Sequence, residues 1–191
     1  TCNVMRMVKE ELNYTGMYII DSQNLSSGYG MLVLAAAEMA EEGLSPEQIC
    51  QRVELLCPRS HTSFLLDTLE FMRAGGRCST IASFGASLLK LKPCIEVENQ
   101  DGAHMHVGKK YRGNMEHCLM EYVHNKLEGR DDIDLRRAFI THSGSPDSDI
   151  KMVLKEVKKL QKFKEIYITH TNCTISTHCG PRTLGVVFLT K

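Results

Sequence analysis

Polar and apolar residues alternate along this chain with two periods, one typical of helices and one typical of short strands. Apolar side chains fall on one helical face in residues 1–12, and again from Leu25 to Met39, where Gly43 favours a helix end. Between these stretches, residues 17–20 form a short apolar run of the kind found in buried parallel strands. This alternation of helix and strand predicts an α/β layer.

The tetrapeptide Ser-Pro-Glu-Gln at residues 45–48 predicts the start of another helix, which would run to Pro58. Its serine and glutamine have the spacing of a capping box, and proline suits the first helical position. A single strand cannot cover helices on two sides. Residues 1–59 are therefore expected to be the remainder of an N-terminal α/β domain whose other strands lie upstream.

Residues 60–191 are expected to form a second α/β domain with a mixed sheet and helices. Its strands are predicted where apolar or alternating runs occur, at residues 62–66, 94–97, 104–111, 138–141, 166–168 and 184–189. Its helices are predicted from periodicity and capping residues, at residues 69–73, 80–92, 113–128 and 146–160. A hairpin turn is expected at residues 99–102, and a charged, solvated linker at residues 128–137. The predicted fold class is a two-domain α/β protein with an incomplete first domain.

The composition narrows the class of protein. The 191 residues are 42% hydrophobic and 24% charged, which is typical of a globular chain. Basic and acidic residues both number 23, so the net charge is zero and gives no electrostatic footprint for nucleic acid. The longest uncharged apolar run, residues 30–37, is too short for a membrane span, and no signal-sequence pattern opens the chain. We therefore expect a cytoplasmic protein.

The cysteines and the first residue lead to expectations about the redox state of the thiols and about whether the chain is a fragment. The eight cysteines are spread along the chain without a CxxC pair, which favours reduced thiols over a disulfide scaffold. The chain begins with Thr1, directly at the start of a predicted helix. We therefore expect it to be a fragment of a longer protein.

Residues 175–181 hold the densest group of chemically capable side chains, and their Gly-Pro pair predicts a sharp turn that carries His178. One interpretation is a zinc site built from His170, Cys173, His178 and Cys179, but this spacing matches no usual ligand pattern. Another interpretation is a cysteine nucleophile at Cys179. Neighbouring residues of an extended chain point in opposite directions, so the base for that nucleophile would have to come from elsewhere.

A third interpretation treats the same turn as a ligand-recognition loop. His178 would hydrogen-bond an anionic head group, helped by an arginine such as Arg77 or Arg112. The plain alternative is that His178 only satisfies a buried carbonyl group. Residue chemistry alone leaves these interpretations open.

Four stretches of the chain follow one another in a characteristic order and spacing. They are residues 64–77 (Phe-Leu-Leu-Asp-Thr-Leu-Glu-Phe-Met-Arg-Ala-Gly-Gly-Arg), 88–93, 107–113 (Val-Gly-Lys-Lys-Tyr-Arg-Gly) and 177–185, which holds Thr-His-Cys-Gly-Pro and then Leu-Gly. In this arrangement the chain resembles the DegV family of bacterial fatty-acid-binding proteins. Residues 19–30 also resemble the last strand and helix of that family's first domain, so the resemblance covers nearly the whole chain.

The resemblance implies two α/β domains that enclose one fatty acid, whose tail lies in the second domain. It implies an acyl carrier for a fatty acid kinase, hence binding without catalysis and without a cofactor. By this likeness His178 and Gly180 belong to the polar network around the carboxylate. Arg112 would be the arginine used when the kinase phosphorylates the bound acid, and Arg77 a second candidate at the mouth. Contacts with the acyl tail are expected from the apolar residues Phe71, Ile81, Phe84, Leu88 and Ile95, although such a stripe is also typical of core.

The chain departs from the family's pattern at Ser176, Cys179 and Arg182, where the family usually carries glycine, threonine and glycine. Arg182 adds a charge that could reach the head group or the kinase. The serine- and threonine-bearing loops that complete the family's carboxylate site are expected to fall outside this chain. We therefore expect uncovered helix faces that aggregate, pair with another copy or associate with the missing half. The alternative function is a small-molecule hydrolase or transferase that uses Cys179 and His178.

Overall fold

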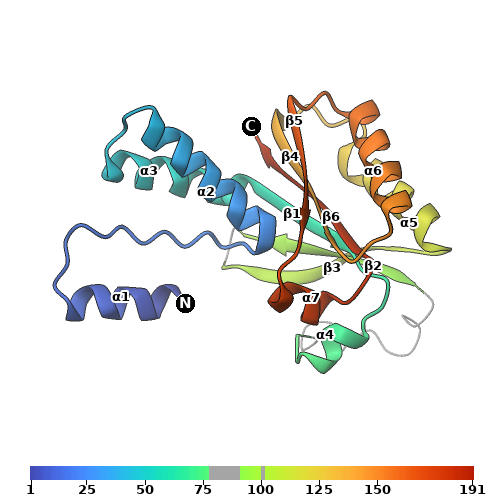
Figure 1. The fold of residues 1–191 in the computed structure, drawn as a ribbon, viewed down its shortest axis with the longest axis horizontal. Coiled ribbons are helices and arrows are strands. Elements are labelled where there is room, and N and C mark those ends of the chain that lie inside the picture. Colours follow the sequence, from blue (N-terminus) through green and yellow to red (C-terminus); the bar gives the residue numbers. More distant parts are fainter. Residues whose placement is uncertain (78–90, 100–101) are drawn as a thin grey trace.

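The structure, a computed structural model, describes residues 1–77, 91–99 and 102–191 (Figure 1). Its centre is a six-stranded mixed sheet with the strand order β3-β2-β1-β6-β4-β5. The strands are β1 (Ser60–Leu65), β2 (Lys92–Glu98), β3 (His104–Tyr111), β4 (Ile133–Ser143), β5 (Glu165–His170) and β6 (Thr183–Thr190). Neighbouring strands are antiparallel except β4 and β5, which are parallel. The expected α/β fold with a mixed sheet is confirmed.

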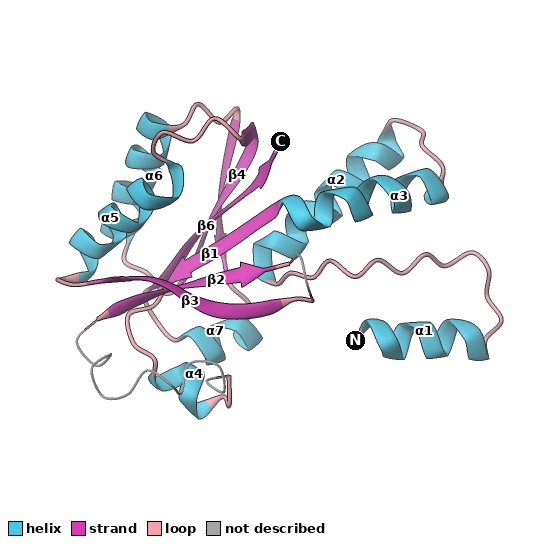
Figure 2. Ribbon diagram, turned by 180° about the vertical axis from the view of Figure 1, so that it is seen from behind, coloured by secondary structure: helices cyan, strands magenta, loops and turns pink. Residues whose placement is uncertain are grey.

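Helices cover both faces of this sheet. They are α1 (Cys2–Glu11), α2 (Ser26–Glu41), α3 (Pro46–Leu56), the 3-10 turn η1 (Cys57–Arg59), α4 (Glu70–Ala74), α5 (Met115–Leu127), α6 (Asp147–Leu160) and α7 (Cys173–Cys179). Helices α5 and α6 lie side by side on one face, while α2 reaches the other face and α3 packs along α2 (Figure 1, Figure 2).

Strand β6 is buried on both faces, and its alternation shows how the layers are built. Leu184, Val186 and Phe188 face α5 and α6, whereas Val187 and Leu189 face α2 and α3. An apolar run without polar interruptions is what such a doubly covered strand requires. Burying one large aliphatic side chain stabilises a fold by roughly 1.5–3 kcal/mol, so both helical layers contribute to the sheet's stability.

One phenol ties α5 to two strands at once. The hydroxyl of Tyr122 donates to the carbonyl oxygen of Ser63 in β1 at 2.8 Å and accepts from the amide of Val186 in β6 at 2.9 Å. Ser63 and Val186 face each other in the strand pairing. The fully buried hydroxyl is therefore satisfied by the sheet itself.

The capping box predicted before α3 is present. The amide of Gln48 donates to Ser45 Oγ at 3.3 Å, and the amide of Ser45 donates to Gln48 Oε1 at 2.9 Å. Helix α2 also lies where its periodicity places it, and it packs through Met31 and Leu32 against Val187 of β6. The domain boundary at residue 60 stays a prediction.

Three local expectations are wrong, each for a physical reason. Residues 17–20 form no strand, because no neighbouring strand lies beside them in the described chain (Figure 1). Residues 133–137, expected as a linker, belong to β4, and Ile133 is 1% exposed. Residues 175–179, expected as a turn, are part of helix α7.

The N-terminal helix forms as predicted, with its apolar face exposed. Helix α1 stands apart from the sheet at the end of an extended segment (Figure 1), and its apolar Val4 and Leu12 are 62% and 66% exposed. The helix predicted around residues 81–88 lies outside the described residues. Among the helices that the structure describes, none has both the length and the apolar character needed to cross a membrane.

Candidate functional site

Most of the candidate residues lie at one end of the sheet. There β1, β3, β4 and β5 end, whereas β2 and β6 begin, because Leu65 pairs with Leu184, Lys92 with Tyr111 and Ser143 with Thr183. Helix α4 follows β1, and α7 lies between β5 and β6. The topology therefore brings the two helices together, and both figures show them side by side (Figure 1, Figure 2).

Helices α4 and α7 fit together through two reciprocal contacts between a glycine and a ring. A Cβ added to Gly75 would lie 2.2 Å from His178 Nδ1, and a Cβ added to Gly180 would lie 2.3 Å from Phe71 Cδ2. Each helix thus offers a bare glycine to the ring of the other, and any larger residue would collide. The structure brings together His178, Gly180 and Phe71, all three of which the sequence singled out, and adds Gly75.

His178 lies in the last turn of α7, between the capping residues of that helix. Asn172 Oδ1 accepts the amide of Ile175 at 3.0 Å, and Gly180 ends the helix with φ +78°. The buried Nδ1 of His178 has no hydrogen-bond partner among the described residues, so the interpretation that it satisfies a buried carbonyl finds no support. An unpaired buried nitrogen costs roughly 1–3 kcal/mol and calls for an explanation at a candidate site.

An apolar layer lies between these two helices and the sheet. Its buried members are Phe64, Leu66, Met72, Ile95 and Cys179. Ile95, which was expected to contact an acyl tail, is 0% exposed and faces this layer from β2. Ile81, Phe84 and Leu88 lie outside the described residues.

Cys179 is buried rather than poised to react. Burial raises the pKa of its thiol to about 11, so the nucleophilic thiolate is scarce near neutral pH. It shares a helical turn with His178, not the extended chain that the sequence suggested. Across the described residues, no group of three His, Cys, Asp or Glu side chains is arranged to hold a metal ion.

The two candidate arginines are exposed. Arg77 folds back onto α4 and donates from Nη1 to the carbonyl oxygen of Gly75 at 2.6 Å. Arg112 directly follows β3 at the same end of the sheet. Neither has an ion pair among the described residues. Both cations are therefore available to solvent or to a partner.

Arg182, noted above as a departure, lies between α7 and β6 and is anchored. Its Nη2 donates to Asp149 Oδ2 at 2.8 Å, and Asp149 is 2% exposed. The hydrogen bond to Asp149 raises the pKa of Arg182. Its backbone is left-handed with φ +58°, which costs an L-residue roughly 1–2 kcal/mol.

Sequence reasoning missed a group of hydroxyls near this end of the sheet. Thr141 Oγ1 lies 2.6 Å from Ser27 Oγ and 2.9 Å from Thr169 Oγ1, and the other two are 3.2 Å apart. Thr141 and Thr169 are directly paired near the ends of the parallel strands β4 and β5. Two threonines near the ends of consecutive predicted strands were the signal that could have found them.

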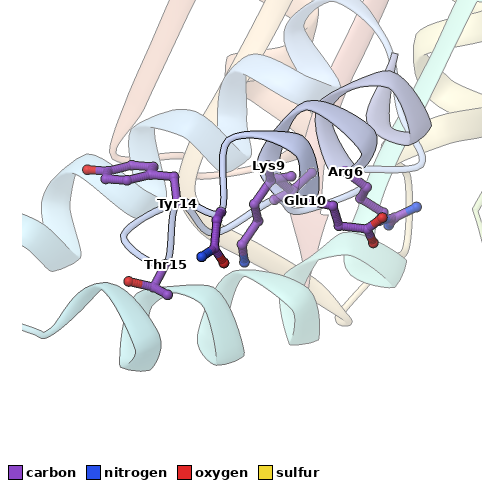
Figure 3. Close-up of a pocket in the computed structure, with 7 residues that line it drawn as sticks. Arg6, Lys9, Glu10, Tyr14 and Thr15 are labelled. Atoms are coloured by element: carbon purple, nitrogen blue, oxygen red, sulfur yellow. The ribbon is translucent and has the colours of Figure 1, made fainter.

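Two open cavities of the described chain lie elsewhere. One of about 510 Å³ lies between α1 and the segment after it (Figure 3). Its lining is Arg6, Lys9, Glu10, Asn13, Tyr14, Thr15 and Ile19. A second, of about 710 Å³, lies between α1 and α2. None of the candidate site residues lines either cavity.

Comparisons with known proteins agree on one family. The family model described as "Uncharacterised protein, DegV family" matches residues 1–191. A DegV domain-containing protein of Caldanaerobacter subterraneus is 32% identical over 177 residues, which are 91% of this chain and 60% of that protein. The chain therefore spans less than two thirds of that relative's length.

Solved structures with the same fold were also found. A structure described as fatty acid binding of a DegV family protein from Thermus thermophilus has a TM-score of 0.80 and 28% identity, and the match covers 100% of this chain and 66% of that one. The Fatty Acid Kinase B3 protein of Streptococcus pneumoniae, solved loaded with linoleic acid, has a TM-score of 0.82 at 14% identity. That match covers 99% of this chain and 65% of the other, and it shows the fold alone.

Proposed function

This chain belongs to the DegV family, and on that premise we propose that it binds a long-chain fatty acid and presents its carboxylate to a fatty acid kinase. The carboxylate would lie at the contact between α4 and α7, and the tail would enter the apolar layer beneath them. The Thermus thermophilus protein named above is described as binding fatty acid, and the Streptococcus pneumoniae protein carries linoleic acid.

One observation carries the proposal most strongly. The ring of His178, with its unpaired buried nitrogen, stands beside an apolar layer that includes Ile95 and Met72. A fatty acid has the same two parts, a polar head that needs hydrogen bonds and a tail that avoids water. Each methylene removed from water contributes roughly 0.8 kcal/mol, so the tail supplies affinity while the head sets orientation.

The kinase step would use the exposed arginines. Phosphoryl transfer to the bound carboxylate builds negative charge at the mouth of the site, and a cation there stabilises it. Arg112 is exposed, so a partner could reach it. The chain would act as carrier and not as enzyme, in keeping with the buried, protonated thiol of Cys179. A cytoplasmic location, where a kinase finds nucleoside triphosphate, is part of the same proposal.

Denaturing extraction followed by mass spectrometry tests the binding step. Purified protein, as isolated and after incubation with a mixture of long-chain fatty acids, is expected to release a fatty acid at close to one molecule per chain. A sample denatured before incubation controls for non-specific adsorption. Recovery no greater than this control, even after loading, would contradict the proposal.

The kinase step has its own test. With kinase, ATP and bound acid, Arg112→Ala is expected to lower the rate of acyl-phosphate formation at least tenfold while fatty acid binding stays unchanged. Arg52→Ala, which changes an exposed arginine on α3, is the matched control. Equal rates in both variants would remove Arg112 from the kinase contact.

A further inference from the structure

The turn between α7 and β6 contains two left-handed residues. Gly180 has φ +78° and Arg182 has φ +58°. Glycine adopts this conformation freely, whereas the Cβ of arginine disfavours it. A strained residue persists only where its surroundings over-determine its conformation. The contacts of Arg182 therefore indicate what holds the turn.

A buried carboxylate holds Arg182. Asp149 lies in the first turn of α6, where the helix end favours negative charge, and its side chain is only 2% exposed. Arg182 Nη2 reaches it at 2.8 Å, while the arginine side chain as a whole is 38% exposed. The carboxylate is thus fixed on α6, and the arginine extends from the turn to meet it.

Two side-chain hydroxyls also donate hydrogen bonds to backbone carbonyl oxygens around the same turn. Thr183 Oγ1 donates to the carbonyl oxygen of Cys179 at 2.9 Å, and Ser145 Oγ donates to the carbonyl oxygen of Thr183 at 3.3 Å. Arg182 Nε is buried and finds no acceptor among the described residues. The single hydrogen bond to Asp149 therefore orients the guanidinium. Asp67 and Glu116 also act on Arg182 through their charge, but neither forms an ion pair with it.

The candidate site residues directly precede Arg182 in the chain. Gly180 receives the ring of Phe71, and His178 stands two residues earlier with its ring against Gly75. Both contacts are tight, because a Cβ at either glycine would already collide, so a change in the turn is passed on to the rings packed against it. A displacement of Arg182 would therefore move the His178 imidazole.

We propose that Asp149 and Arg182 are a positioning pair for the His178 site. Asp149 holds Arg182, Arg182 holds the turn, and the turn sets where the His178 ring lies. Neither residue needs to touch the ligand. The effect on ligand binding rests on the proposed function, whereas the effect on His178 does not.

Two other roles for Arg182 make different predictions. If the arginine contacted the head group directly, removing it would weaken binding while Asp149→Asn, which keeps the cation, would not. If the pair only stabilised the fold, both variants would lower the melting temperature without changing affinity or the environment of His178. Positioning requires that Asp149→Asn and Arg182→Ala act alike.

The experiment compares wild type, Asp149→Asn, Arg182→Ala and the double variant. The dissociation constant is measured by displacement of a fluorescent fatty acid, and the Hε1 resonance of His178 is followed by NMR in ligand-free protein. The resonance is assigned by its loss in His178→Gln. Each single variant is expected to bind about tenfold more weakly and to shift this resonance. The double variant is expected to bind fatty acid no more weakly than either single variant, because all three remove the same Asp149–Arg182 contact.

Two further variants sharpen the result. Arg182→Lys keeps a cation near Asp149 and is expected to recover part of the affinity. Asp132→Asn breaks a more exposed Arg–Asp pair at the opposite end of the sheet, where Arg130 Nη2 lies 2.5 Å from Asp132 Oδ2 and the side chain of Asp132 is 50% exposed, and is expected to change nothing. Wild-type affinity and an unshifted His178 resonance in Asp149→Asn would overturn the proposal. If wild type binds no fatty acid, the proposed function fails while the His178 resonance still decides the positioning role.

Discussion

The two faces of the sheet are covered in different ways. On one face, α5 and α6 enclose a core whose buried members are nearly all apolar, and the hydroxyls of its two buried tyrosines, Tyr111 and Tyr122, both have hydrogen-bond partners. On the other face, α2, α4 and α7 leave an unpaired nitrogen on His178 and depend on bare glycines for their fit. The α5/α6 face also leaves the buried Nδ1 of His61 without a partner among the described residues, so the two faces differ in how their helices fit: through apolar side chains on one, and around glycines on the other.

The largest expected effect comes from the core beneath α5. Leu119→Ala removes a side chain that is 1% exposed and is expected to lower the free energy of unfolding by ~2–5 kcal/mol. Fatty acid affinity should not change. Met72→Ala, which is equally buried on the site face, is expected to lower both stability and affinity. Denaturant titration and ligand displacement measure the two quantities, and a loss of affinity in Leu119→Ala would break the comparison between faces.

The α5/α6 face also carries the strongest expected pH dependence. The ring of His61 stacks on Phe188 at 4.6 Å, and desolvation, followed by the charges of Lys126 and Arg130, lowers its pKa to about 4. In the unfolded chain His61 has its ordinary pKa of about 6.5 and takes up a proton more readily than in the folded protein. The contribution of the neutral, buried His61 to folding stability is therefore complete above pH 6.5 and is lost as the pH falls toward 4. The total loss is on the order of 3 kcal/mol.

His61→Phe keeps the stack and removes the titration. Urea titrations between pH 4 and 7 are expected to show a flatter dependence of unfolding free energy on pH in this variant. His104→Phe, at an exposed position on β3, serves as the control and should leave the slope unchanged. Identical slopes in wild type and His61→Phe would show that His61 is not the group responsible.

A smaller effect is expected where α7 ends on the site face. Gly180→Ala places a Cβ on a residue with φ +78° and against the ring of Phe71. The strain is expected to lower the free energy of unfolding by ~1–3 kcal/mol, and fatty acid affinity should fall with it. Gly43→Ala, also at positive φ but with open space around it, is the matched control for backbone strain alone. Unchanged affinity in Gly180→Ala would separate the α4–α7 contact from the site.

The smallest expected effect is at the start of α3, the helix that packs along α2. Ser45→Ala removes the side chain that accepts the amide of Gln48, and such a cap is worth ~1 kcal/mol. Thermal unfolding should show a slightly lower midpoint, with fatty acid affinity unchanged. A coupled loss of affinity would mean that α3 supports the site as well as the sheet.

The strands and long helices could be predicted from the sequence because their periodicity is local. The long helix α6 and the doubly buried β6 both carry this signal over their full length. Strand β4 was predicted too short because residues 133–137 are rich in charged side chains. Residues 17–20 show the converse, since an apolar run becomes a strand only when another strand pairs with it.

The site could be predicted only in part. His178 was singled out by the residues around it, and Gly180 and Phe71 by likeness to a family. The structure brings the three together, but their roles in binding stay predictions. Helix α7 was missed because seven residues are too few to show a helical period, although Asn172 is a residue type that favours a helix start. The contact between Gly75 and His178 joins residues far apart in the sequence, and no local pattern encodes it.

The hydroxyl of Tyr122 makes the docking of a helix and the pairing of two strands a single event. Because the amide of Val186 donates to this oxygen, that amide can be released to solvent only when α5 detaches or β1 and β6 separate. Its hydrogen-exchange rate therefore reports either the detachment of α5 or the separation of β1 and β6. Tyr122→Phe would uncouple the two motions and leave that amide exchanging by local fluctuation.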